Sequence, residues 1–277
     1  MINQNEGIKV INMTNNNQPI ENTKQYLDNQ IALSRCTFDG FKFDTTDSPL
    51  SEIEKCKGII IKQELEYFEI ITGFERNTSY NIFGETSEGY KYLYKCKENT
   101  GCLARWLCPT ATRKLDMNFF HNSSNDKPKN IVNFLKPFKC PFFCLSRPEI
   151  FLELEESKEK IGRILQVFSC SENLYEIYDS KDQIKYIVKG KCCQYGLLFS
   201  NTILGKIGEA FFNIIDPETK EEIGSISKQT SVMSEGVNDG ENFKIDFPEK
   251  ASTNDKLLLM ALGLMIDYQY FEIGPMN

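Results

Sequence analysis

The sequence predicts a mainly β domain, a sandwich or closed barrel, together with a hydrophobic C-terminal helix. Three observations indicate this fold class: short apolar stretches spaced roughly ten residues apart, a recurring hairpin pattern, and one almost wholly apolar stretch near the C-terminus. The chain has 277 residues, of which 40% are hydrophobic and 26% are charged. This composition is ordinary for a globular protein and sufficient for one large domain.

The first strands are expected directly after residue 56. Residues 58–64 are rich in β-branched side chains, and residues 66–73 alternate between apolar and polar, which is typical of paired strands. One pattern then recurs at residues 80–84, 175–179 and 212–216: an aromatic residue, a polar residue, Ile, any residue and a turn former. Each copy precedes a polar turn and another apolar stretch, so the pattern predicts repeated β-hairpins.

A helix is expected over residues 256–272. The unbroken apolar run Leu257–Ile266 is far shorter than the ~20 residues that cross a membrane. Asp267 and Gln269 interrupt any extension of that run. Because a helix that is apolar on all sides needs cover all round, this stretch favours a core helix over a membrane span. A closed barrel would supply the cover.

Residues 1–50 differ from the rest of the chain. They are rich in Asn and poor in large apolar side chains, which predicts a disordered N-terminal tail before a folded domain of residues 51–277. The formal net charge of −7 gives no overall attraction for nucleic acid or anionic lipid, so no nucleic-acid partner is expected. The N-terminus lacks a secretory signal pattern, and the ten cysteines are not expected to form a disulfide framework.

No zinc site and no catalytic residues are expected. Cys96, Cys102 and Cys108 are evenly spaced, but the chain has no Cys-x-x-Cys pair, the close spacing that structural zinc sites use. The single histidine, His121, lies in a loop-like stretch and is expected at the surface. No Gly-x-Ser-x-Gly nucleophile motif accompanies it, so the sequence does not predict an enzyme.

Several segments, in order from about residue 53 to residue 272, resemble the phospholipid scramblase family. The opening block is Ile61–Glu64 with Glu69 and Thr72–Asn77, and further matching segments are Lys136–Pro141, Lys160–Gln166, Ile223–Lys228, Asn242–Pro248 and Ile266–Glu272. The resemblance implies a tubby-like fold, which is a closed β-barrel of about a dozen strands around a hydrophobic C-terminal α-helix. This expectation agrees with the core helix deduced above.

The resemblance also implies a function. It is the calcium-stimulated, bidirectional movement of phospholipids between membrane leaflets, which needs no covalent chemistry. The implied partner is a phospholipid membrane, and the implied location is the cytoplasmic face of the plasma membrane. An alternative stays open: a membrane-associated lipid-binding adaptor or signalling protein that transports nothing.

The resemblance places a calcium-binding segment on Asp239, Glu241, Phe243, Ile245 and Phe247. Asp239 and Glu241 alternate along a predicted strand, so their carboxylates are expected on one face, where they would offer the oxygen ligands that Ca²⁺ prefers. Lys244 and Lys250 occupy positions where an EF-hand loop has Gly and Glu, so we expect a weak site, in the millimolar to high micromolar range. The same residues are also typical of a solvated acidic edge strand.

Cys140 and Cys144 are the candidate lipidation sites. The resemblance implies fatty acylation, such as palmitoylation, in this segment, and the basic residues Lys136, Lys139 and Arg147 flank it. One acyl chain anchors a protein weakly and two anchor it stably, so both thiols are expected to matter. The other interpretation is a pair of small buried cysteines. The sequence offers a second candidate pair at residues 192–193.

Overall fold

The structure is a computed structural model of the chain. It describes residues 49–64, 78–99, 113–121, 129–139, 147–194, 197, 209–229 and 242–271. The chain divides into two compact units, residues 1–36 and residues 37–277, and every described residue belongs to the second unit. Most of the predicted tail and all of the predicted strand at residues 66–73 therefore lie outside the described residues.

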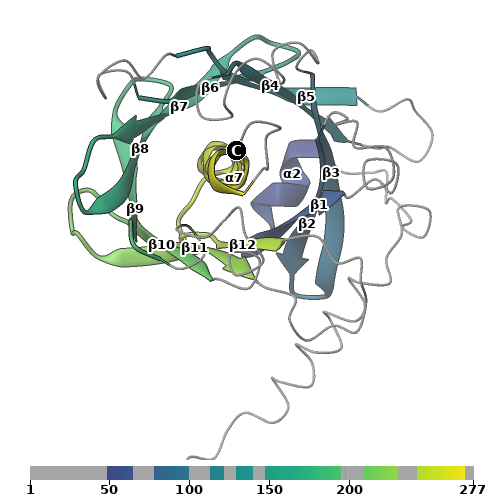
Figure 1. Ribbon diagram of the computed structural model, residues 1–277. Coiled ribbons are helices and arrows are strands. Elements are labelled where there is room, and N and C mark those ends of the chain that lie inside the picture. Colours follow the sequence, from purple (N-terminus) through teal and green to yellow (C-terminus); the bar gives the residue numbers. More distant parts are fainter. Residues whose placement is uncertain are drawn as a thin grey trace, which may run out of the picture. The chain divides into compact units, whose positions relative to one another are not determined.

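The described strands close into a single antiparallel barrel (Figure 1). Each strand pairs with its neighbours in sequence, and pairing of the first strand with the last closes the barrel. The strands are β1 (Gly58–Glu64), β2 (Ser79–Thr86), β3 (Gly89–Glu98), β4 (Leu115–His121), β5 (Lys129–Lys136), β6 (Glu149–Leu154), β7 (Lys160–Val167), β8 (Glu172–Asp179), β9 (Ile184–Lys191), β10 (Ala210–Ile215), β11 (Glu222–Gln229) and β12 (Asn242–Asp246). The predicted closed, mainly β fold is confirmed.

The recurring sequence pattern marks three hairpins, as predicted. Its three copies lie in β2, β8 and β10, and these strands pair with β3, β9 and β11 respectively. Two of the turns contain a residue in the left-handed region, Asp182 with φ 60° and Lys220 with φ 63°. Such a residue reverses the chain tightly, so these hairpins need few residues outside the strands.

Alternation along the strands fills the barrel interior. In β4, every second side chain is buried, from Leu115 to His121, and β12 buries Phe243 and Ile245 in the same way. Successive side chains of a strand point to opposite faces, so one apolar set lines the inside and one polar set faces outward. The interior apolar residues form a single hydrophobic core.

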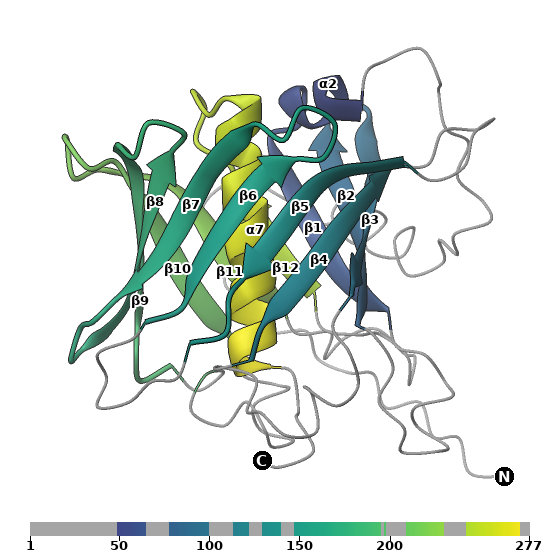
Figure 2. The same ribbon diagram turned by 90° about the horizontal axis from the view of Figure 1, so that it is seen from above.

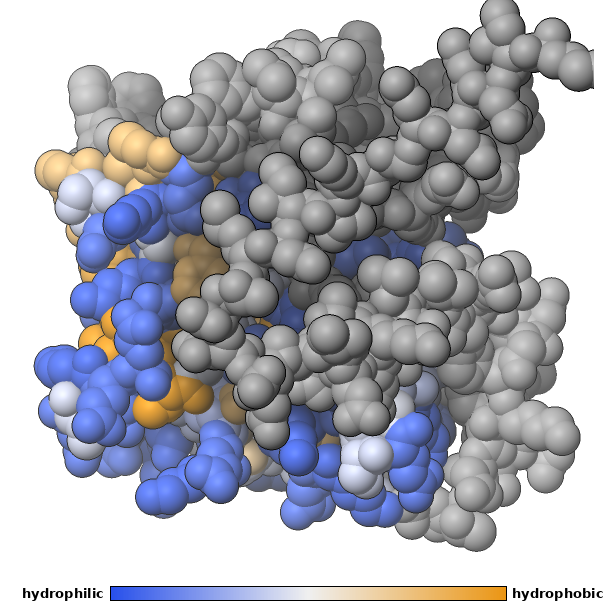
Figure 3. Space-filling model, turned by 90° about the horizontal axis from the view of Figure 1, so that it is seen from below, coloured by the Kyte–Doolittle hydropathy of each residue, from blue (hydrophilic) through white to orange (hydrophobic). Residues whose placement is uncertain are grey.

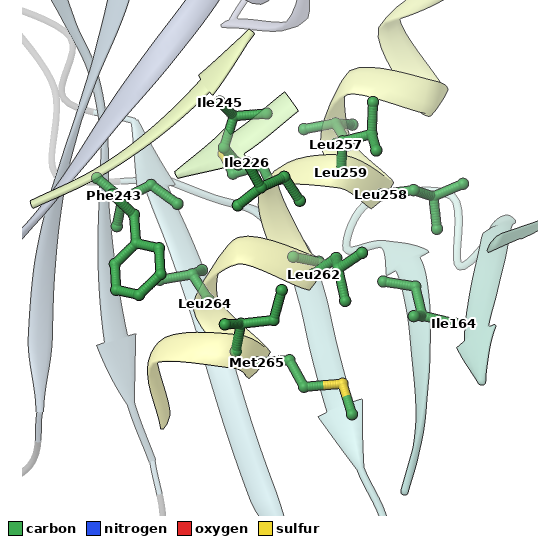
Figure 4. Close-up of a cluster of buried hydrophobic side chains, with 14 of the residues drawn as sticks. Ile164, Ile226, Phe243, Ile245, Leu257, Leu258, Leu259, Leu262, Leu264 and Met265 are labelled. Carbon is green, nitrogen blue, oxygen red and sulfur yellow. The ribbon is translucent and has the colours of Figure 1, made fainter. Parts of the chain in front are cut away.

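Helix α7 (Thr253–Tyr270) runs through the barrel, and its residues Asp255–Tyr268 are all buried (Figures 1 and 4). The helix begins three residues before the predicted start because Ser252 caps it. The Ser252 hydroxyl accepts a hydrogen bond from the Asp255 amide, and the Asp255 carboxylate accepts one from the Ser252 amide. This capping box satisfies two amides that would otherwise lack partners. Phe271 forms the C-cap.

The helix approaches the barrel wall closely at Gly263. A Cβ atom at this position would lie 2.7 Å from the Cδ1 atom of Ile245 and 3.2 Å from the Cδ1 atom of Ile61. These two side chains come from β12 and β1, the pair that closes the barrel. Because Gly263 has no Cβ atom, α7 can approach the barrel wall closely where β1 pairs with β12.

The two ends of the barrel differ in their connections (Figure 2). At one end, which we call the short-turn end, the connections are residues 87–88, 122–128, 155–159, 180–183 and 216–221. At the other end, which we call the long-connection end, they are residues 65–78, 99–114, 137–148, 168–171, 192–209 and 230–241. Helix α7 begins at the short-turn end and ends at the long-connection end.

Helix α2 (Pro49–Glu54) lies at the short-turn end beside the start of α7 (Figure 2). The buried ammonium group of Lys256 donates hydrogen bonds to three carbonyls at and just after the end of α2. They belong to Ile53 (3.4 Å), Glu54 (2.7 Å) and Cys56 (2.9 Å). A cation here satisfies carbonyls that a helix leaves without partners. Lys256 thereby ties the two helices together.

His121 is buried at this end, so its expected surface position was wrong. Its exposed fraction is 8%, and its Nε2 atom lies 3.5 Å from the Glu52 carboxylate of α2. The same carboxylate accepts a hydrogen bond from Lys91 at 2.8 Å. Although burial alone would raise the pKa of Glu52, the contacts with His121 and Lys91 outweigh burial and lower it.

Candidate functional site

Strand β12 and the residue after it hold the described part of the predicted calcium segment. Three of its members have buried apolar side chains, with exposed fractions of 1%, 0% and 8%: Phe243, Ile245 and Phe247. The Phe243 ring packs against Phe271, with ring centroids 5.5 Å apart. These side chains line the interior around α7 (Figure 4), so they contribute packing and offer no side-chain oxygen to a cation.

The two predicted carboxylate ligands, Asp239 and Glu241, lie outside the described residues. They directly precede β12, which begins with Asn242 at the long-connection end. Within β12, the backbone pairs with β1 on one side and with β11 on the other. Strand β12 is therefore held on both sides where it follows the predicted carboxylate ligands. The calcium site itself stays a prediction.

On the outer face of β12, Asp246 already has partners. Its carboxylate lies 2.9 Å from the Lys244 ammonium and accepts a hydrogen bond from the Ser225 hydroxyl at 3.0 Å. The alternation of β12 turns Asp246 to the face opposite to Phe243 and Ile245.

Cys140 and Cys144 also lie outside the described residues, but their flanking residues are described. Phe138 is 57% exposed, and Lys139 forms an ion pair with Glu149 at 2.8 Å. Lys136 was expected to help attract a membrane surface as one of the flanking basic residues. It is 2% exposed and donates a hydrogen bond to the Arg113 carbonyl, so its ammonium group does not face a membrane surface.

Several described cysteines present their thiols at the long-connection end. Cys170 and Cys193 are exposed, whereas Cys192 is half-buried, and the sulfur atoms of Cys192 and Cys193 are 3.3 Å apart. Cys96, one of the three evenly spaced cysteines, is instead buried beside Met117. The second candidate pair is therefore available for modification, and the Cys96 thiol is part of the core.

A buried polar cluster surrounds the last turns of α7. It consists of Tyr80, Glu98, Arg113, Lys136, Asp267 and Tyr268. Tyr80 donates a hydrogen bond to the Asp267 carboxylate at 2.7 Å, and the Nε atom of Arg113 donates one to the Tyr268 hydroxyl.

Arg113 and Lys136, the basic members of the cluster, contact each other and other members of the cluster. The Arg113 guanidinium lies over the Tyr268 ring, 4.7 Å from its centroid, and 3.9 Å from the Glu98 carboxylate. Lys136 donates a hydrogen bond to the Arg113 carbonyl at 2.9 Å. Since buried charges are costly unless they are paired, this cluster fixes how deeply α7 sits in the barrel.

The sequence contained a partial signal for this cluster. Asp267 interrupts an apolar helix, and Ile266–Tyr268 belongs to the closing segment that resembles the scramblase family. The partners could not be read from the chain, because Tyr80 and Arg113 lie 187 and 155 residues away from Asp267 and Tyr268.

Two features are absent from the part of the chain that the structure describes. Among the residues that the structure describes, no three His, Cys, Asp or Glu side chains gather closely enough to hold a metal ion. Within the same residues, none of the helices combines the length and the apolar character needed to cross a membrane.

The fold defines a class of protein: a closed antiparallel barrel that encloses its own C-terminal helix. Residues 41–273 match the sequence model of the Scramblase family. The chain therefore belongs to the scramblase family, and the resemblance seen in the sequence is confirmed.

Curated relatives agree with this assignment. The chain is 26% identical over 227 residues to phospholipid scramblase 1 of Homo sapiens, covering 80% of this chain and 64% of the relative. It is 25% identical over 218 residues to phospholipid scramblase 1 of Rattus norvegicus, covering 77% of this chain and 59% of the relative. It is 24% identical over 229 residues to phospholipid scramblase 4 of Mus musculus, covering 82% and 65%. The chain thus spans less than two thirds of the length of these relatives.

Proposed function

We propose that this protein moves phospholipids between the two leaflets of a membrane, in both directions, and that calcium stimulates the movement. The observation that carries the proposal is the family match over residues 41–273, together with relatives that are named phospholipid scramblases. Bidirectional movement of lipid requires only a lower barrier for headgroup passage. We place the protein at the cytoplasmic face of the plasma membrane.

Calcium is proposed to act at Asp239 and Glu241. These carboxylates directly precede β12 at the long-connection end, which also carries the flanks of the candidate lipidation segment. A bound Ca²⁺ would neutralise the two carboxylates and could share its remaining coordination positions with lipid phosphate oxygens, since Ca²⁺ takes six to eight oxygen ligands. This arrangement would couple calcium to lipid contact at one end of the barrel.

Acylation of Cys140 and Cys144 is proposed to hold the protein at the membrane. The exposed Phe138 before the segment and the position of Arg147 after it show that both flanks reach the long-connection end. Two acyl chains give stable attachment where one chain gives only a reversible one.

A second candidate function is a lipid-binding adaptor that transports nothing. The observation that favours it is the burial of α7: the most apolar segment of the chain is enclosed by the barrel. The two functions differ in one measurable quantity, the rate at which lipids cross the bilayer.

The test is lipid movement in reconstituted vesicles. Fluorescent-lipid access would be followed with and without calcium for the wild-type chain, for Asp239→Ala/Glu241→Ala, and for the matched control Glu218→Ala/Glu221→Ala, which removes two exposed carboxylates at the short-turn end. We expect calcium-stimulated flux in the wild type and control, and loss of the stimulation in the first variant. Flux that calcium stimulates equally in all three chains would move the calcium site elsewhere. Membrane binding with no flux in any chain would support the adaptor.

A further inference from the structure

Exposed aromatic side chains gather at the long-connection end. Four of the six exposed large hydrophobic residues in the described part of the chain belong to the strand ends or connections there: Leu135, Phe138, Phe168 and Phe211. A fifth, Phe151, lies in the middle of β6. The sixth, Ile184, begins β9 at the short-turn end. Phe138, Phe168 and Phe211 are at least half exposed, at 57%, 57% and 50%.

These three phenylalanines are spread along the rim of the barrel. Phe138 follows β5, Phe168 follows β7, and Phe211 lies at the start of β10, so no two of these strands are neighbours. A bound peptide would need one continuous groove or sheet edge, and a closed barrel has no free edge. A broad apolar layer at one end of the barrel, by contrast, can contact all three rings together.

The surroundings of the rings are suited to a membrane interface. The Arg147 guanidinium lies 4.7 Å from the centre of the Phe168 ring, which joins a cation to an apolar ring, a combination that suits the boundary between headgroups and acyl chains. The Gln194 side chain fixes the backbone of Phe211 through two hydrogen bonds, of 2.6 and 2.9 Å. The exposed thiols of Cys170 and Cys193 lie beside the same strand ends.

The rest of the described surface offers a contrast. Figure 3 shows the side of the molecule that faces down in Figure 1; hydrophilic residues cover much of the described surface there, and hydrophobic residues appear at the upper left corner and in patches lower down. In sequence, two connections of the long-connection end carry many apolar residues, since residues 140–146 are CPFFCLS and residues 195–208 are YGLLFSNTILGKIG, whereas residues 230–241 are TSVMSEGVNDGE, which is mostly polar. The turn at residues 216–221 of the short-turn end is DPETKE, which is polar and acidic.

We propose that Phe138, Phe168 and Phe211 form a membrane-docking rim that inserts into the interface of a phospholipid bilayer, with the axis of the barrel steeply inclined to the membrane. The inference rests on the proposed function for the identity of its partner. It adds which face of the barrel meets the lipid and which side chains enter it. Helix α7 then stays inside the barrel while the protein is docked.

The experiment is vesicle co-flotation of the full-length, unacylated chain with phosphatidylcholine vesicles, with and without phosphatidylserine. The test variant is Phe138→Ser/Phe168→Ser/Phe211→Ser, and the matched control is Ile184→Ser, which removes an exposed hydrophobic residue at the opposite end. Circular dichroism and thermal unfolding would show that each variant is folded. Each ring is about half exposed, so each of the three can still transfer apolar surface from water into the membrane interface. We therefore expect the triple variant to bind on the order of a hundredfold more weakly, and the control to bind as the wild type does.

A second readout does not depend on the triple variant folding. Trp106 is the single tryptophan of the sequence, so Trp106→Phe gives a background without tryptophan emission. In this background, a single reporter Phe168→Trp should shift its emission to the blue and be quenched by brominated lipid, whereas Ile184→Trp should show neither change. Equal binding of the triple variant and the wild type, equal weakening by Ile184→Ser, or quenching at position 184 instead of 168 would overturn the docking rim. Binding that is lost in the triple variant, beside a wild type that moves no lipid, would uphold the rim and contradict the scramblase activity instead.

Discussion

At the scale of single residues, the buried polar cluster at the end of α7 is where the chain departs furthest from an apolar core. Asp267 is 2% exposed and Arg113 is 1% exposed. Breaking a buried pair leaves an uncompensated group, whereas a loose apolar contact can adjust. The cluster therefore holds the helix at a defined depth and rotation within the barrel.

The hydrogen bond from Tyr80 to Asp267 is expected to contribute to stability. Replacement Tyr80→Phe keeps the ring and removes the donor from a buried carboxylate, so the free energy of unfolding should fall by about 1.5–3 kcal/mol. The measurement is urea unfolding followed by circular dichroism. Tyr178→Phe is the matched control, because Tyr178 donates to Glu176 on the outer face of the barrel. Equal effects of the two substitutions would mean that burial of the cluster adds nothing.

Lys136 should make stability depend on alkaline pH. Burial, and then the positive charge of Arg113, lowers the pKa of its ammonium from 10.5 to about 8. Between these two values, the unfolded chain holds a proton that the folded protein has released, so raising the pH through this window favours the folded state. Unfolding titrations of wild type and Lys136→Met from pH 7 to about 10.5 should show this gain for the wild type relative to the variant. Parallel curves would show that the side chain titrates normally.

At the scale of elements, α7 is the central feature of the core. Leu262 is fully buried on it, so Leu262→Ala should leave a cavity and lower the free energy of unfolding by about 2–5 kcal/mol. The control Leu135→Ala, at a residue that is 38% exposed, should cost less than about 1 kcal/mol. Denaturant unfolding of both variants tests this. A small loss at Leu262 would indicate that the helix packs loosely.

The sequence predicted elements better than it predicted contacts. Alternation and the recurring aromatic–polar–Ile pattern identified β2, β8 and β10 because these signals are local. The length and composition of the run before Asp267 identified a core helix, because an apolar stretch too short to span a membrane needs cover. His121 was misplaced because it was interpreted as part of a loop, whereas it occupies the last inward position of β4. Its partner there, Glu52 of α2, is far away in the sequence.

The candidate site was predictable only in part, because some of its features also depend on residues that are distant in the sequence. The inward positions of Phe243 and Ile245 follow from strand alternation. The burial of Lys136 and the exposed rim at Phe138, Phe168 and Phe211 follow from barrel closure, which decides the end to which each strand points. A pattern along the chain carries no such information.

At the scale of the whole molecule, the barrel separates packing from surface function. Helix α7 fills its interior, and α2 and the short turns lie at its short-turn end. The long-connection end holds the flanks of the predicted calcium and lipidation segments and the exposed phenylalanines. We propose that membrane contact, calcium binding and acylation all occur at this end of the barrel.

The central claim is that this barrel moves phospholipids across a bilayer in both directions. The most direct measurement follows a short-chain, acyl-labelled fluorescent phospholipid in vesicles that contain the purified chain at known density. Outward movement is read by dithionite reduction of label that started in the inner leaflet, and inward movement by the loss of label that albumin can extract. The account predicts that both rates rise together when calcium is added, and that neither rises in vesicles without protein. Bound protein with rates equal to those of empty vesicles, at any calcium concentration, would contradict it.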